Sequence, residues 1–164
     1  MWRSLLILSI LFFISACTKQ VPEGDKKNSR SSEEIAVEQT IMNFIEAYNS
    51  NDIDKAVTFF ESDYKGVVSD SDDVVGLDML KNDLTQYKKQ YPGGKWEIKI
   101  DEVNISGELA YVFTSGSFVM PDPIEDKMSP IYSERAIRIL RKKKNDGWSI
   151  FRYLATPTFS YDDK

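Results

Sequence analysis

The stretch FIEAYNSNDIDKAVTFF, residues 44–60, decides the fold because it contains two helix patterns separated by a sharp break. Before the break, apolar residues recur at the spacing of one buried helical face: Val37, Ile41, Phe44, Ile45 and Tyr48. The polar residues 49–52 end this helix and cap the next one. A short second helix is predicted over residues 53–60. The stretch therefore predicts two consecutive helices, the first of which opens near Ser32.

The rest of the chain changes from helical to strand periodicity. A short strand is predicted over residues 64–68, and a third helix follows Gly76 until the Pro-Gly-Gly run at residues 92–94. From Trp96 onward apolar and polar residues alternate, which predicts strands near residues 96–101, 108–120, 132–142 and 148–155. The Asn-Asp-Gly run at residues 145–147 predicts a tight hairpin. Helices followed by an antiparallel meander indicate the α+β class.

The amino terminus has the order of a secretion signal. Arg3 precedes an apolar run over residues 5–14, and small residues lead to Cys17, the only cysteine. This order resembles a bacterial lipobox, in which the cysteine receives a diacylglyceryl group and becomes the new amino terminus. We expect residues 1–16 to be a signal peptide, residues 17–32 a lipidated flexible tether, residues 33–157 the folded domain and residues 158–164 a C-terminal tail.

The resemblance to a lipobox also implies a location. Stable anchoring takes two or more acyl chains, which this modification supplies. We therefore expect a membrane-anchored protein of the cell envelope, on the outer membrane or the extracytoplasmic face of the inner membrane. The alternative is an uncleaved anchor, but the apolar run is shorter than the roughly 20 residues that a bilayer core requires.

The composition excludes several kinds of site. The chain has 26 acidic residues against 21 basic ones and no histidine. We expect no nucleic-acid partner, because that binding depends on neutralising phosphates with a basic face. Without histidine there is no imidazole acid–base, no Ser-His-Asp triad and no His-based metal site. The acidic turn at residues 70–73 lacks the ligand spacing of a calcium loop. We therefore expect no metal, and we also expect no cofactor.

The residues quoted first also carry a family likeness. Residues 44–54, followed by Phe59 and Phe60, resemble the helix-turn-helix opening of the nuclear transport factor 2-like superfamily. The predicted closing hairpin, from Arg135 through residues 145–150, is similar to the last hairpin of that superfamily. The resemblance implies a cone in which three N-terminal helices pack on a curved antiparallel sheet, with a pocket between them. The superfamily contains ketosteroid isomerases, SnoaL-like cyclases, dehydratases and binding domains, so the likeness leaves the activity open.

The isomerase pattern can be compared with this chain residue by residue. The resemblance places Phe44 at the position of the oxyanion-donor tyrosine and Val68 near that of the aspartate base. The strand over residues 136–140 offers no aspartate for the third role. These positions cannot supply the donors and base that the mechanism requires. The sequence therefore favours a non-catalytic domain that binds a small apolar ligand or an envelope protein. The alternative is a SnoaL-like or isomerase-like enzyme that uses another carboxylate, with Asp70 and Glu134 as the catalytic candidates.

The candidate pocket residues are aromatic side chains from the helices and strands, together with two charged residues that could orient a ligand. Aromatic residues in such patterns also form ordinary cores, and the charged residues could form structural ion pairs. The candidates are Phe44, Tyr48, Phe60, Tyr64, Trp96, Tyr111, Phe113, Tyr132, Glu134 and Arg152.

The long strand near residues 108–120 is apolar on both faces. Leu109, Tyr111 and Phe113 alternate with Ala110 and Val112. An antiparallel sheet with one solvated face should show a polar side. Either the chain's own loop covers the second face, or two copies pair sheet to sheet, and we expect a homodimer.

Overall fold

The two helices predicted at the start of the domain are present in the computed structural model, which describes residues 30–69, 71–124, 126–144 and 147–160. Helix α1 (Ser32–Asn49) buries Val37, Ile41 and Tyr48 completely. Asn51, at φ 64°, adopts a left-handed conformation that asparagine tolerates. This residue turns the chain into helix α2 (Ile53–Val57).

Helix α2 is shorter than the sequence predicts, because the segment that follows it forms hydrogen bonds with the C-terminal strand of the chain. The prediction of a helix to residue 60 is wrong: strand β1 (Phe60–Val68) begins there. The backbone N–H of Ile150 donates to the carbonyl oxygen of Phe59 at 2.9 Å, and Phe60 lies opposite Ile150. Ladder hydrogen bonds of this kind override a weak helical preference.

The curved sheet has six strands in the order β2-β1-β6-β5-β4-β3. Four of them form the predicted antiparallel meander: β3 (Lys95–Ser106), β4 (Leu109–Pro121), β5 (Met128–Lys142) and β6 (Trp148–Ser160). The expectation of a wholly antiparallel sheet is wrong at one pair, because β1 lies parallel to β6. A parallel pair needs a crossover connection. The long segment between β1 and β6 provides it, and short-range sequence patterns do not reveal such a pairing.

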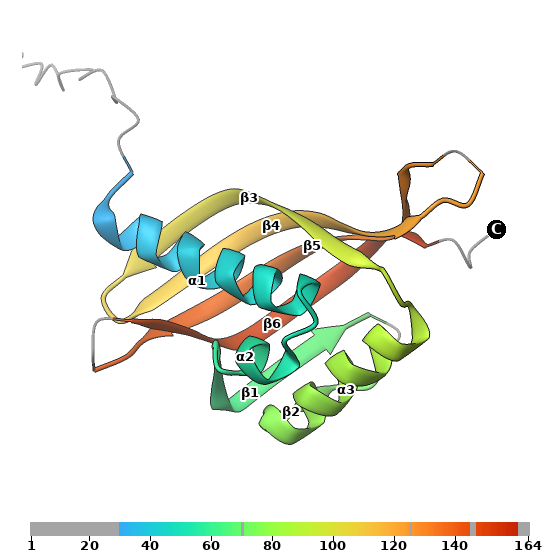
Figure 1. Ribbon diagram of the computed structural model, residues 1–164. Coiled ribbons are helices and arrows are strands. Elements are labelled where there is room, and N and C mark those ends of the chain that lie inside the picture. Colours follow the sequence, from blue (N-terminus) through green and yellow to red (C-terminus); the bar gives the residue numbers. More distant parts are fainter. Residues whose placement is uncertain (1–29, 70, 125, 145–146, 161–164) are drawn as a thin grey trace, which may run out of the picture.

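The remaining elements lie beside β1. Strand β2 (Val74–Val75) pairs with β1, and helix α3 (Gly76–Gln90) follows it directly. Figure 1 shows the three helices along one face of the sheet, with α1 crossing the long strands and α3 near β1 and β2. Gly93, at φ 85°, then redirects the chain into β3. The α+β class and the curved sheet inferred from the sequence are confirmed.

The two faces of the long strands differ in exposure. On the helix side, Ala110, Val112 and Leu140 are buried. On the opposite face Leu109, Tyr111 and Phe113 are exposed, because none of the three described helices lies on that side. Within the described part of the chain, no helix has the length and apolar character needed to cross a membrane.

Several sequence-based expectations fall outside the described residues. These are the signal peptide, Cys17 and most of the tether, the candidate Asp70, the hairpin residues 145–146 and most of the C-terminal tail. The α+β domain itself is described almost completely, and strand β6 continues to Ser160, past the expected domain boundary at residue 157.

Candidate functional site

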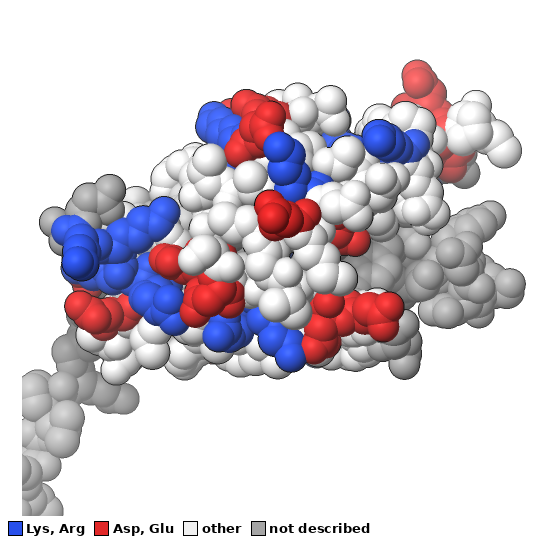
Figure 2. All heavy atoms as spheres, turned by 90° about the horizontal axis from the view of Figure 1, so that it is seen from below, with Lys and Arg blue, Asp and Glu red and all other residues white. Residues whose placement is uncertain are grey.

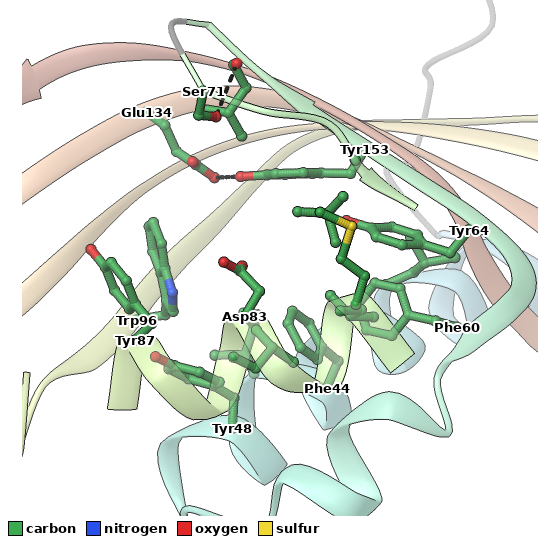
Figure 3. A pocket seen from close by; sticks show the side chains of 18 of the residues that line it. Phe44, Tyr48, Phe60, Tyr64, Ser71, Asp83, Tyr87, Trp96, Glu134 and Tyr153 are labelled. Carbon is green, nitrogen blue, oxygen red and sulfur yellow. Dashed lines mark hydrogen bonds between the residues drawn. The ribbon is translucent and has the colours of Figure 1, made fainter. Parts of the chain in front are cut away.

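A cavity of about 860 Å³ lies between helices α1 and α3 and the inner face of the sheet. Its walls come from both helices and from strands β1, β5 and β6, with Trp96 of β3 closing one side. Figure 3 looks into this space and shows side chains converging on it from opposite walls. The volume falls within the range of small-molecule sites in proteins, roughly 300–1,000 Å³.

Aromatic side chains form most of the cavity wall, and many of them support one another edge to face. The Phe60 ring contacts those of Phe44 and Tyr64, with centroids 4.9 Å apart in each pair. On the other side, the rings of Trp96 and Tyr132 lie 5.8 Å apart at 89°. Such pairs are favourable and hold the rings in fixed orientations. The aromatic lining residues are Phe44, Tyr48, Phe60, Tyr64, Tyr87, Tyr91, Trp96, Tyr132 and Tyr153.

The position of Trp96 is set by the end of helix α1. The Asn49 side chain donates to the Trp96 carbonyl oxygen at 2.9 Å and accepts from the Trp96 backbone N–H at 2.8 Å. These two bonds join residues 47 positions apart in the sequence. Asn49, which the sequence analysis treats only as a helix stop, therefore ties the start of β3 to α1 and holds one wall of the cavity in place.

A buried polar group lies on the sheet side of the cavity. Glu134 and Arg138 are separated by four residues on strand β5, so they point to the same face. An Arg138 Nη2 lies 3.6 Å from a Glu134 carboxylate oxygen, and the other Nη donates to the Thr114 hydroxyl. The Tyr153 hydroxyl donates to Glu134 at 2.5 Å, and the Arg138 guanidinium lies over the Tyr153 ring at 4.8 Å.

The tyrosine hydroxyls of the cavity remain protonated at neutral pH. Burial is the largest cause of the raised pKa of both Tyr153 and Tyr132, and the charge of Glu134 raises both further. Burial also raises the pKa of Tyr48, with smaller contributions from Tyr87 and Asp83. These groups can therefore donate and accept hydrogen bonds without carrying charge.

Helix α3 contributes a second carboxylate. Asp83 points into the cavity from the side opposite Glu134 and Tyr153. Asp83 is an exposed residue, but its surroundings remove part of its hydration and raise the pKa of its carboxyl. Asp83 forms no hydrogen bond or ion pair with any residue that the structure describes.

Asp83 and Tyr87 line the cavity but are not among the pocket residues predicted from the sequence. A usable signal is the helical spacing: Asp83 follows Leu80 by three positions and precedes Tyr87 by four, so it lies on the face that Leu80, Leu84 and Tyr87 mark as buried. A carboxylate in line with an apolar helix face is uncommon enough to indicate a site.

The structure places seven of the ten candidate pocket residues around the cavity: Phe44, Tyr48, Phe60, Tyr64, Trp96, Tyr132 and Glu134. Tyr111 and Phe113 lie on the opposite face of the sheet, because the small side chains of Ala110 and Val112 occupy the face under the helices. Arg152 does not line the cavity either, and its guanidinium donates to the carbonyl oxygens of Asp63 and Phe151 at 2.7 and 2.6 Å.

Two further positions bear on isomerase-type chemistry. Phe44 and Val68, which the resemblance places at the donor and base positions, both line the cavity, and neither side chain can donate or accept a proton. Among the described residues there is also no group of three carboxylate or thiol side chains placed to hold a metal ion. The polar side chains of the described lining are its tyrosines, Trp96, Ser71, Asn82, Arg138 and the carboxylates.

Comparison with solved structures shows the fold. A ketosteroid isomerase-like protein from Erwinia carotovora atroseptica superposes with a TM-score of 0.65 at 19% identity, covering 79% of this chain and 99% of that one. An NTF2-like protein with a cystatin-like fold from Novosphingobium aromaticivorans gives a TM-score of 0.67 at 14% identity, covering 77% and 80%. The fold is NTF2-like.

At sequence identities this low, sharing the NTF2-like fold does not show that two proteins share an activity. A domain of unknown function with a cystatin-like fold from Nostoc punctiforme aligns with a TM-score of 0.68 at 16% identity, covering 82% of this chain and 83% of that one. No protein-family model matches the sequence, and no curated protein matches it. The function has to be argued from the cavity itself.

Proposed function

We propose that this NTF2-like domain binds a small, largely apolar molecule in the cavity between its helices and sheet, without catalysis. The observation that carries the proposal is an aromatic-walled cavity of about 860 Å³ that ends in a fixed polar group. Apolar walls with a few placed polar groups are the usual composition of ligand sites. The polar group is already satisfied internally by Tyr153, Arg138 and Thr114, which suits orienting a ligand better than transferring a proton.

The proposal extends to location. We infer that the chain is an envelope lipoprotein anchored through lipid on Cys17. Helix α1, which continues from the tether, begins beside the basic end of β5, where Lys142 pairs with Glu33 at 2.5 Å. Figure 2 shows Lys and Arg side chains gathered at this end of the molecule, with acidic side chains among them. A basic surface beside the tether is placed to face anionic headgroups. Replacing Cys17 with serine should move the protein out of the membrane fraction.

One observation favours a second candidate, an isomerase-like or SnoaL-like enzyme with a non-standard carboxylate. Asp83 faces the cavity with a raised pKa and no partner among the described residues, as a general base would. Glu134 suits this role less, because its carboxylate already accepts from Tyr153. Turnover of a cavity-bound carbonyl compound that is lost in Asp83→Asn would favour the enzyme.

A cavity-filling variant tests the binding proposal. Leu84 lines the cavity on α3, so Leu84→Trp should occupy part of the space, whereas Ile124→Trp adds the same side chain at a position 91% exposed and away from it. We expect native mass spectrometry of the full chain to detect bound aromatic hydrocarbons and sterols in the parent protein and in Ile124→Trp. Binding should be at least about ten-fold weaker in Leu84→Trp. Equal binding in all three, with unchanged thermal unfolding, would place the ligand elsewhere.

A further inference from the structure

We propose that the ligand of this cavity is an organic cation with an apolar body, and that Asp83 is the group that selects its charge. The inference rests on the proposed ligand-binding function and adds the chemical class of the ligand. It is carried by the unbalanced charge of the cavity lining, by the placement of Asp83 and by the aromatic walls.

The charged groups of the lining do not balance. Asp72, Asp83 and Glu134 contribute carboxylates, and Arg138 is the single lining residue with a positive charge in the described part of the chain. Arg138 is committed to the sheet side, where it contacts Glu134, the Thr114 hydroxyl and the Tyr153 ring. Glu134 thus offsets most of the Arg138 charge, which leaves Asp83 without a cation among the described lining residues on the helix side. The Lys88 ammonium of α3 does not line the cavity; it lies over the Tyr48 ring at 4.5 Å and donates to the Gly94 carbonyl oxygen at 3.0 Å.

Asp83 occupies that helix side without compensation. It projects from α3 into the space between the aromatic walls and forms neither an ion pair nor a hydrogen bond with any described residue. Asp83 is an exposed residue whose carboxylate keeps part of its hydration, so its charge is open to a ligand that enters the cavity. A ligand cation pairs with this carboxylate, so binding energy and charge selection come from the same group.

The surroundings of Asp83 suit a cation further. The ring faces of Tyr87 and Trp96 lie on the same side of the cavity, and aromatic faces attract cations within about 6 Å of the ring centre.

Other charged ligands fit this lining less well. An anion would meet three carboxylates and find the Arg138 guanidinium, the single positive charge in the described lining, already engaged. A bare metal ion would find no group of three suitable side chains among the residues described. An ammonium or quaternary ammonium on an apolar body matches both the carboxylate and the aromatic walls.

A pair of ligands that differ only in charge tests the inference. (2-Naphthylmethyl)trimethylammonium and its carbon isostere, 2-neopentylnaphthalene, have nearly the same shape, and 2-naphthylacetate supplies the opposite charge. With the full chain we expect the cation to bind at least about ten-fold more tightly than the isostere, and the anion to bind most weakly. Asp83→Asn should remove the preference for the cation and leave binding of the isostere unchanged.

The control is Asp78→Asn, which removes the same charge from an exposed position on the same helix that does not line the cavity. It should retain the preference, because the effect depends on contact with Asp83 and not on net charge. If the isostere binds but the cation has no advantage, or if Asp83→Asn keeps that advantage, the inference fails while the proposed binding function stands. If none of the three probes binds, both fail.

Discussion

Glu134 and Arg138 form an ion pair inside the protein, with only 3% and 5% of their side-chain surfaces exposed. Such a pair contributes little net stability, but removing one partner leaves an uncompensated charge. We expect Arg138→Met to lower the free energy of unfolding by about 3–5 kcal/mol. Adding Glu134→Gln should recover part of this loss, because the amide oxygen still accepts from Tyr153 and carries no charge. Urea unfolding of the single and double variants measures both effects.

The matched control for the ion pair is Arg135→Met, at an exposed position next to Glu134. Its side chain lies on the outer face of the sheet, so its loss should cost no more than about 1 kcal/mol. A similarly small loss of unfolding free energy for Arg138→Met would mean that the buried Glu134 carboxylate does not need the Arg138 guanidinium to offset its charge.

Asp83 should make stability depend on pH. Its pKa in the folded protein lies above the ordinary carboxyl value of about 3.9, so the folded state binds this proton more tightly than the unfolded chain does. The stabilisation from protonation is therefore complete below the unfolded pKa and is lost as pH rises through the folded one. We expect Asp83→Asn to melt at a higher temperature than the parent protein at about pH 7, and at the same temperature at about pH 3. If the two melting temperatures differed by the same amount at both pH values, the Asp83 carboxyl would be excluded as the cause of the difference.

At the scale of elements, helix α1 depends on its first turn. The Ser31 hydroxyl accepts from the Glu34 backbone N–H at 3.1 Å, and the Glu34 carboxylate accepts from the Ser31 N–H at 2.6 Å. This reciprocal pair satisfies two backbone donors that the helix cannot satisfy itself. We expect Ser31→Ala to lower the free energy of unfolding by about 0.5–2 kcal/mol, measured by urea titration. Ser32→Ala, one position later, should change it little, and equal losses would refute the assignment of the cap to Ser31.

The same elements show what the sequence could reveal. Helical spacing identified α1 and α3, and alternation identified the four strands of the meander, because these signals are local. The parallel pairing of β1 with β6 could not be predicted, since it joins Phe60 to Ile150 across most of the chain. The alternation of apolar and polar residues within a strand does not show which distant strand it pairs with.

The choice of strand face limited the prediction of the site. Strand β4 is apolar on both sides, so alternation alone could not decide whether Tyr111 and Phe113 or Ala110 and Val112 face the helices. The larger aromatic side chains were the natural candidates for a pocket, but Ala110 and Val112 are the residues buried on the helix side, and Tyr111 and Phe113 are exposed on the other face. The candidates on α1, β1 and β5 line the cavity, because the buried stripe of α1 and the inner faces of β1 and β5 turn toward it.

At the scale of the whole molecule, the outer face of the sheet exposes a group of large apolar side chains. Tyr111 and Phe113 are each 40% exposed and pack edge to face at 5.7 Å. The strand register places Ile139 opposite Tyr111 and Ile137 opposite Phe113, and Leu154 lies beside Ile137 on β6. The patch is therefore continuous across three strands. Continuous apolar surface of this kind commonly marks an interface, and we propose that a second copy of the chain covers it.

Phe113 belongs to this patch and packs against both Tyr111 and the neighbouring strand, so Phe113→Lys should separate the proposed dimer into monomers. An isologous interface contains each residue twice, and the substitution therefore places two like charges in apolar surroundings at once. We expect sedimentation equilibrium of the full chain in density-matched detergent to give the mass of two chains for the parent protein and of one for the variant. Ile35→Lys, at a position on α1 that is 52% exposed, is the control and should leave the dimer intact. A parent protein with the mass of one chain would leave the patch to a different partner, and a variant that remains dimeric would place the interface on another surface.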